Sequence, residues 1–383
     1  MKKLIALLLA LVMVMALAAC GAKEAAPATE AAPAAEAAPA GEAAPAEEAA
    51  PAEEETLYIP VMAKGFQHQF WQAVAKGSAD AAADYGVEIY FDGPASETEI
   101  AAQVNMVKQE MAKNPKAMAL AALDTSAVAD ILDECAEKGI PVIGFDSGVP
   151  GDTSGAVKAT ACTNNEAAAG IAAEKFGENA DLVAKMQAAT TDAPVIIACL
   201  SQDAVSASVS GRTTGFVNKM KEVASQYGTV AVTGHDKWAE GDVAAASIII
   251  EVAISATTEA VDVQAAANGL LAKDNLIAVF CSNEGVVTGF LAAVSDGEDL
   301  ADGGKYADLV VAGFDAGATQ KNAIRQGWFY GSVTQDPYHI GYYAVEMAVA
   351  AAKGEAVEDK DTGAQWYDAS NIDDEMIALL VYD

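Results

Sequence analysis

The sequence predicts an α/β protein with two doubly wound, parallel-sheet lobes joined by a three-strand hinge. From residue 56 onward, short β-branched apolar runs alternate with longer helical segments, which is the pattern of βαβ units. The runs are too many for one compact sheet of this type, so we expect two lobes. An internal repeat agrees, because "VIGFDSG" at 142–148 and "VAGFDAG" at 311–317 share V, G, F, D and G.

The first half of the folded part contains four predicted strands separated by helices. Helices are expected at 67–85, 96–113 and 126–138, and Gly86 and Gly139 are placed to end the first and the last of them. The strands follow the apolar runs 56–63, 86–93, 117–123 and 140–148.

The alternation restarts after Asn164 and defines the second half. Its strand candidates are 193–201, 228–236, 276–283 and 308–315, with helices in the gaps. In both halves of the repeat an aspartate, Asp146 or Asp315, follows a strand. Ligands of open α/β sheets sit at that edge, so two facing lobes would line one cleft from both sides.

The N-terminus predicts a lipoprotein signal peptide over residues 1–19. Lys2 and Lys3 precede an apolar run, 4–17, that is too short for a comfortable membrane span. The run leads into Leu-Ala-Ala-Cys-Gly at 17–21, which resembles the lipobox of bacterial lipoproteins. The resemblance implies cleavage before Cys20 and its lipidation, palmitate included. The alternative is an ordinary signal peptide with a chance cysteine.

Residues 20–55 are expected to be a lipidated Cys20 followed by a disordered tether. The segment repeats "EAAPA", and its prolines block helix propagation while its glutamates repel one another. Almost nothing large and apolar is present to be buried, so we expect no packed structure there.

Composition excludes several classes of partner. The 383 residues carry 22 Lys+Arg against 55 Asp+Glu, a net charge of −33, which argues against nucleic acid and against a basic grip on anionic lipid. The five Cys and three His give no zinc signature, and we expect neither metal nor cofactor. Apolar neighbours favour buried free thiols over disulfides at Cys135, Cys162, Cys199 and Cys281.

The folded part, 56–383, resembles the type I periplasmic solute-binding proteins of ABC sugar importers, of the ribose and galactose type. The resemblance rests on motifs that occur in the family's order: "HQFWQAV", "LDTSAV", "VIGFDSG", "SGRTTGF", "AVFCSNE", "VAGFDAG" and "SVTQDPYHIGYYAVE". It implies hinge strands near 161–165, 334–337 and 361–365. The N-terminal lobe would then be 56–162 plus 336–362, and the C-terminal lobe 163–335 plus 363–383. Two segments, 178–192 and 240–273, are longer than usual; in the second we expect an additional helical turn or loop.

On the first lobe, the resemblance implies ligand contacts after two strands. His68 falls on a polar contact, and Phe70 and Trp71 fall where the family's aromatic rings flank a sugar. Because helical spacing also fits a core role, we expect one of these rings in the cleft and one partly in the core. Asp146 falls on a carboxylate that accepts two sugar hydroxyls, followed by Ser147 where ribose-binding members often have Arg.

The sequence allows two interpretations of Asp124. It is either a further ligand acceptor or the N-cap of helix 126–138.

On the second lobe, the resemblance implies five further contacts. Arg212 matches an arginine whose position near a helix start calls for a compensating carboxylate, Asp146 or Asp315. Asn283 and Asp315 match a paired amide and carboxylate, for which capping and turn roles are the alternative. The remaining positions are an aromatic, Trp238, and an amide at a crossover, Gln335.

Together these features predict a lipid-anchored, extracytoplasmic, monomeric binding protein. It would capture a monosaccharide-like ligand by hinge closure and present it to an ABC permease. One alternative is a sensor input protein that presents the bound sugar to a chemoreceptor or histidine kinase. A carbohydrate-active enzyme is disfavoured, because no activated nucleophile, phosphate loop or metal set is found, and we expect no catalytic residues. The lipobox and a missing helix-turn-helix segment argue against a lac-type repressor.

Overall fold

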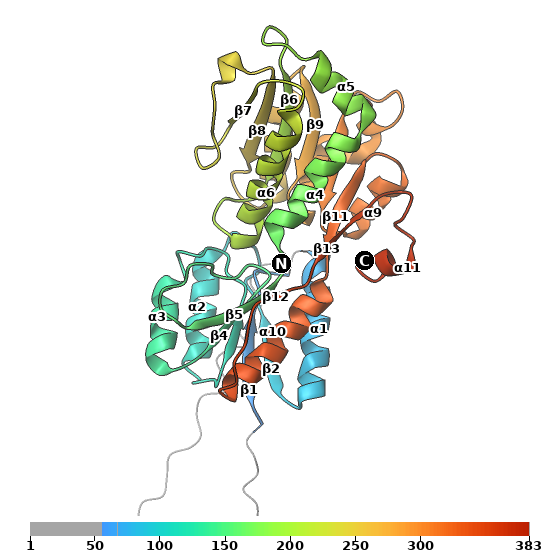
Figure 1. Ribbon diagram of the computed structural model, residues 1–383. Coiled ribbons are helices and arrows are strands. Elements are labelled where there is room, and N and C mark those ends of the chain that lie inside the picture. Colours follow the sequence, from blue (N-terminus) through green and yellow to red (C-terminus); the bar gives the residue numbers. More distant parts are fainter. Residues whose placement is uncertain (1–55, 67, 383) are drawn as a thin grey trace, which may run out of the picture. The chain divides into compact units, whose positions relative to one another are not determined.

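The computed structural model describes residues 56–66 and 68–382, which form two α/β lobes (Figure 1). The predicted fold class is confirmed, because each lobe is built on a largely parallel sheet with helices on both faces. The predicted signal peptide, Cys20 and the tether lie outside the described residues. None of the described helices is long and apolar enough to cross a membrane.

The first lobe contains a six-stranded sheet in the order β12-β5-β4-β3-β1-β2, in which all neighbours are parallel. Its strands are β1 (Tyr58–Met62), β2 (Glu88–Asp92), β3 (Met118–Leu120), β4 (Val142–Phe145), β5 (Val157–Cys162) and β12 (Lys360–Asp361). Successive residues of a strand face opposite sides of the sheet. Val61 therefore packs under α1 (Gln69–Tyr85) and α10 (Pro337–Ala352), while Met62 packs under α2 (Ile100–Met111) and α3 (Ala129–Lys138).

The second lobe contains a seven-stranded sheet in the order β13-β11-β10-β9-β6-β8-β7, with only β13 antiparallel to its neighbour. Its strands are β6 (Val195–Ser201), β7 (Val230–Thr233), β8 (Ile248–Ile254), β9 (Leu276–Cys281), β10 (Val310–Phe314), β11 (Gly331–Gln335) and β13 (Ala364–Tyr367).

Helices cover both faces of this second sheet. One layer consists of α4 (Asn165–Glu178), α5 (Ala180–Ala188) and α6 (Ala207–Ala224). The other consists of α7 (Ala260–Leu271), α8 (Glu284–Ala293) and α9 (Ala318–Arg325), with the short α11 (Glu375–Ala378) at its edge. Two 3₁₀ turns, η1 (Val243–Ala245) and η2 (Ser295–Leu300), complete the lobe.

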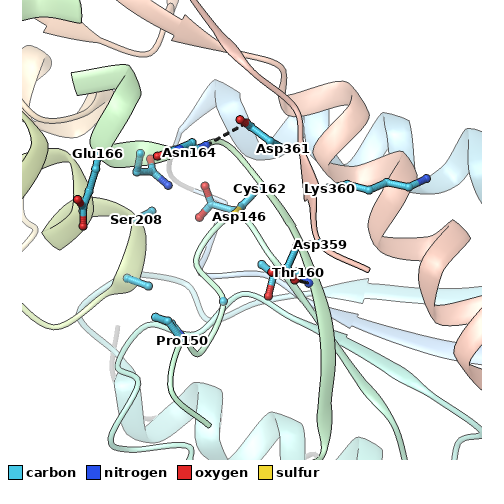
Figure 2. A pocket seen from close by; sticks show the side chains of 14 residues that line it. Asp146, Pro150, Thr160, Cys162, Asn164, Glu166, Ser208, Asp359, Lys360 and Asp361 are labelled. Carbon is cyan, nitrogen blue, oxygen red and sulfur yellow. Dashed lines mark hydrogen bonds between the residues drawn. The ribbon is translucent and has the colours of Figure 1, made fainter. Parts of the chain in front are cut away.

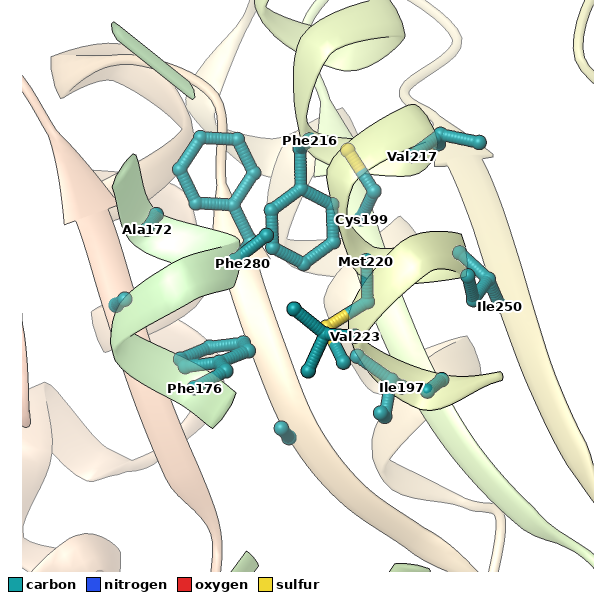
Figure 3. Packing of buried hydrophobic residues seen from close by; sticks show 14 of the residues in the cluster. Ala172, Phe176, Ile197, Cys199, Phe216, Val217, Met220, Val223, Ile250 and Phe280 are labelled. Carbon is teal, nitrogen blue, oxygen red and sulfur yellow. The ribbon is translucent and has the colours of Figure 1, made fainter. Parts of the chain in front are cut away.

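Aromatic stacking organises the first of these layers (Figure 3). The Phe216 ring of α6 lies parallel to the Phe280 ring of β9, with centroids 4.5 Å apart, and Phe176 of α4 meets Phe216 edge-on at 5.8 Å. Each such pair contributes about 0.5–1.5 kcal/mol of stability beyond what the burial of its apolar area provides. The three rings thus join two helices to the sheet.

The segment 240–273 differs from the prediction. It contains the seven-residue strand β8, "IIIEVAI", before α7, whereas we expected only an additional helical turn or loop. The residues of β8 are rich in isoleucine and pair with β6 along its whole length. A β-branched run of this kind favours a strand buried between two others, so the local composition could have predicted β8.

The chain passes between the two sheets three times. The passages lie between β5 and α4, between β11 and α10, and between β12 and β13, within the three segments predicted as the hinge. The exact lobe limits stay a prediction. All four of the cysteines Cys135, Cys162, Cys199 and Cys281 are free thiols, as predicted, but only three of them are buried: Cys162 is half-buried, because it ends β5 beside a pocket.

Two glycines set the distance between α1 and α10, which run side by side in Figure 1. A Cβ on Gly77 would lie 1.9 Å from the backbone oxygen of Tyr338, and one on Gly341 would lie 2.0 Å from that of Val74. The helices therefore touch backbone to backbone, and Ser78 Oγ donates a hydrogen bond to Gly341 O at 3.2 Å. No side chain fits at either glycine without moving a helix.

We expect Gly77→Ala to lower the free energy of unfolding by about 1–3 kcal/mol, because overpacking forces the two helices apart. Gly269→Ala is the matched control, since it lies within α7 and a Cβ there meets nothing within 4 Å. That substitution should raise stability by up to about 1 kcal/mol. Urea unfolding of both variants measures the difference, and equal behaviour would refute the close contact.

Candidate ligand-binding site

A cavity between the lobes gathers eight of the eleven predicted contact residues. These are His68, Phe70, Trp71, Asp146, Arg212, Asn283, Asp315 and Gln335. Its volume is about 20 Å³, on the scale of a single water molecule. Small-molecule sites usually have roughly 300 Å³ or more, so admitting a ligand requires the lobes to separate and the facing side chains to rearrange.

The carboxyl ends of parallel strands explain this convergence. Asp146 follows β4, Asn283 follows β9 and Asp315 follows β10, so all three emerge at sheet edges that face the cleft. Asp146 and Asp315 both have left-handed backbones, with φ of 50° and 72°. Aspartate tolerates this conformation better than most residues.

Arg212 and Asp315 form the centre of the second lobe's contribution. Arg212 Nη1 lies 3.3 Å from Asp315 Oδ2, and both side chains are nearly inaccessible to solvent. This confirms that a carboxylate compensates the cation. Arg212 Nε also donates to Asn165 Oδ1 at 2.8 Å, and the guanidinium lies 3.8 Å from the centroid of the Phe314 ring. Gln335 Nε2 donates to Asp315 Oδ1 at 2.7 Å, so the whole group is held rigidly.

A second ion pair, Lys64 with Glu97, belongs to the first lobe. Lys64 Nζ lies 3.6 Å from Glu97 Oε2, and Trp71 Nε1 donates to Glu97 Oε1 at 2.9 Å. Burial alone would raise the pKa of Glu97, but Lys64, His68 and the hydrogen bonds from Trp71 and Gln202 lower it to about 2. Burial opposes the charge on Lys64, yet Glu97, followed by Asp146 and Asp203, raises its pKa. Both partners are therefore ionised.

Asp146 differs from these paired groups. The residue is 5% exposed, and no hydrogen bond to its carboxylate is found among the described residues. Burial, opposed by Lys64 and Arg212 and reinforced by Asp315 and Glu97, raises its pKa to about 6. Asp146 is thus a buried acceptor that still has its bonding capacity available.

Glu284 and His68 complete the charged lining. Glu284 accepts hydrogen bonds from the backbone N–H groups of Gln69 and Phe70, at 3.3 and 3.4 Å. Burial raises the pKa of Glu284, with His68 opposing and Asp315 adding to the effect. His68 Nε2 lies 4.0 Å from Glu97 Oε1 and has no hydrogen-bond partner among the described residues.

The two aromatic residues do not divide as predicted. Phe70 and Trp71 are 5% and 2% exposed, and both belong to the core beneath α1 while lining the cavity. Their rings meet edge-on at 5.0 Å, and Trp71 meets Phe145 edge-on at 6.3 Å. The core supports both rings at the wall of the cavity.

Three predicted contacts lie elsewhere. Asp124 accepts from the N–H groups of Ser126 and Ala127 in the turn before α3, so it holds this turn; the helix begins only at Ala129, and Val128 is its N-cap, so Asp124 does not cap it. Trp238 lies beside α6, where its indole donates to Thr214 Oγ1 at 2.9 Å and its ring packs against the core. Ser147 Oγ is used by backbone N–H groups of α6.

Five lining residues were missed: Lys64, Glu97, Ser208, Val209 and Glu284. Lys64 and Glu97 belong to loops after β1 and β2, at the same sheet edge as Asp146. The order of the strands could therefore have predicted that both residues line the cavity. Among the described residues, no group of His, Cys, Asp or Glu is spaced to hold a metal ion.

A larger pocket of about 470 Å³ adjoins the cavity through Asp146 and Ser208, on the side of the hinge (Figure 2). Asp361 Oδ1 accepts from the Asn164 N–H at 3.0 Å, which fixes one wall. Lys360 extends away toward α10, where its ammonium contacts Glu346. Asp146 therefore faces space on both of its sides.

Two lobes joined by three passages of the chain, with a polar cavity between them, are an arrangement suited to binding. A family model described as a periplasmic binding protein domain matches residues 59–356, and the chain belongs to that family. It is a family of extracytoplasmic binding proteins rather than enzymes, and the fold is its type I form.

Three relatives illustrate the similarity. The D-allose-binding periplasmic protein of Escherichia coli is 25% identical over 310 residues, 80% of this chain and 88% of that protein. A structure from Brachyspira murdochii, described as an ABC transporter, LacI family transcriptional regulator, is 40% identical with a TM-score of 0.71, over 86% of this chain and 99% of that one. An Agrobacterium vitis ABC transporter solute-binding protein with bound D-fucose is 26% identical with a TM-score of 0.69, over 85% and 100%.

We expect Asp146→Asn to stabilise the folded protein at about pH 7.5 by about 2–3 kcal/mol. The pKa of Asp146 is raised from 3.8 to about 6, so ionising the buried carboxyl lowers stability as the pH rises through that interval. Below about pH 4 the carboxyl of wild-type Asp146 is protonated in both the folded and the unfolded state, so the stability advantage of the variant should vanish. Thermal unfolding of wild type and variant at both pH values tests this, and a pH-independent difference would contradict it.

Proposed function

We propose that the chain is the solute-binding protein of an ABC importer and captures a monosaccharide between its lobes. The observation that carries this is the pair of strand-end carboxylates, Asp146 and Asp315, lining one cavity with the donors Arg212, Asn283 and Gln335. Its sugar-binding relatives support the same conclusion. Lipid anchoring and the particular sugar belong to the proposal.

The chemistry of the lining suits a polyol. Each sugar hydroxyl donates one hydrogen bond and accepts others, so it can bridge a carboxylate and an amide or guanidinium. Asp146 supplies unused acceptor capacity, whereas Asp315 is already held by Arg212 and Gln335 and so presents a fixed wall. Phe70 and Trp71 offer apolar ring surface for the C–H groups of a sugar.

Closure completes the site, because each lobe supplies only part of the lining. The ligand would bind one lobe in an open form, and rotation about the three passages would bring the other lobe into contact. Ligand shifts this equilibrium only by its preference for the closed form. The importer would then recognise the closed form, in which both lobes are in contact with the ligand.

Binding is tested by a thermal-shift screen of the chain against D-allose, D-fucose and other monosaccharides, followed by calorimetry. We expect Asp146→Ala and Asp315→Ala to weaken the affinity roughly 10- to 100-fold, because ligand hydroxyls lose a buried acceptor. Trp238→Phe is the control, since this residue lies outside the cavity and should bind as wild type does. Unchanged affinity in both aspartate variants would show that the cleft is misassigned.

For the membrane, we propose that lipid on Cys20 anchors the protein at the extracytoplasmic face, with residues 21–55 as the tether. Anchoring by acyl chains contributes about 0.8 kcal/mol per buried CH₂. Cys20→Ala should therefore release the protein into the soluble fraction on cell fractionation. If the variant stays with the membrane after a high-salt wash, lipidation of Cys20 is not what holds it.

A further inference from the structure

Several of the described helices, α2, α3 and α7 among them, have no side-chain cap of their own at the amino end, and three further ones, α1, α6 and α9, are capped from the opposite lobe. The first N–H groups of any helix have no partner within it. In the second lobe, α4 and α5 meet this need with Asn164 and Asn179, which accept from their own helices. By contrast, α1, α6 and α9 follow His68, Ser206 and Gly317, none of which provides a side-chain hydrogen bond.

The other lobe supplies each missing cap. Gln69 Oε1 of the first lobe accepts from Ala318 N of α9 at 2.8 Å. Ser147 Oγ, also of the first lobe, accepts from the N–H groups of Ala207 and Ser208 of α6, at 3.1 and 3.4 Å.

In the reverse direction, Glu284 of the second lobe accepts from the first two N–H groups of α1. The exchange is reciprocal, because Gln69 is itself the first residue of α1. A helix amino end favours a negative or electron-rich group beside it. Each of these bonds exists only while the lobes are together, since donor and acceptor belong to different lobes.

We propose that capping across the cleft, by Gln69 and Ser147 in one direction and Glu284 in the other, holds the lobes closed and so sets the population of the closed form. Gln69 and Ser147 act as positioning residues, because neither lines the cavity between the lobes. The affinity for a ligand that needs the closed form scales with that population. The inference thus rests on the closure described under the proposed function, but not on which ligand is bound.

The size of the effect follows from measured caps. Loss of one N-cap changes a helix equilibrium by a factor of about 2 to 30. Here the same factor should apply to the equilibrium between closed and open lobes, because each lobe keeps its own sheet and core when the cap is lost. Asn179 provides the comparison, because it accepts from Leu182 N at 2.9 Å within a single lobe.

Hydrogen exchange of the full chain, read by mass spectrometry without added ligand, tests the proposal. Gln69→Leu and Ser147→Ala each remove one acceptor. We expect either variant to speed exchange about 2- to 30-fold at all three helix starts, 68–72, 205–210 and 316–321, because opening exposes them together. Asn179→Ala should speed exchange at 180–185 and leave the three helix starts unchanged.

Each result decides the matter. Faster exchange confined to the helix that lost its own acceptor would overturn the proposal, and so would wild-type exchange in both variants or a response of the helix starts to Asn179→Ala. Should Gln69→Leu fail to fold, Ser147→Ala carries the same test. A failed sugar screen would leave this result untouched, because no ligand enters the measurement.

Discussion

Burying charge at the meeting of two lobes is the constraint on which the rest of this structure depends. Four carboxylates, Glu97, Asp146, Glu284 and Asp315, face only two permanent cations across the cavity. An unpaired charge away from water is costly, so each acid needs a partner. Lys64 serves Glu97 and Arg212 serves Asp315, while backbone N–H groups serve Glu284. Only Asp146 is left for something from outside.

The fold supplies this arrangement without a dedicated scaffold for each side chain. Parallel strands end at a common edge, and two such edges oppose each other because the chain passes between the sheets three times. The aromatic core under α1 and the stacked rings under α6 keep the two walls stiff. Rigid walls would favour the proposed closure, since lobes that deform would spread the motion instead of confining it to the passages between the sheets.

Sequence reasoning recovered the architecture and most of the cavity for identifiable reasons. The repeat at 142–148 and 311–317 placed Asp146 and Asp315 at strand ends, and strand ends meet in this fold. Glu97 and Glu284 were not predicted, because a single acid in a loop or at the start of a helix looks like any solvated residue of a chain this acidic. Trp238 was misplaced for the opposite reason, since a large ring in a loop suggests a ligand wall but here closes a core. Contacts between lobes were beyond reach, because no local pattern encodes them.

The left-handed backbone at Asp146 and Asp315 has an evolutionary consequence. Outside glycine, aspartate and asparagine are the residues that adopt it at least strain, and β-branched or bulky replacements are penalised. Glycine, aspartate and asparagine are therefore the residues that these two sites accept at little cost in backbone strain. The lining of the cavity can therefore vary more freely in the surrounding loops, such as those bearing Lys64 and Glu97, than at these two strand ends.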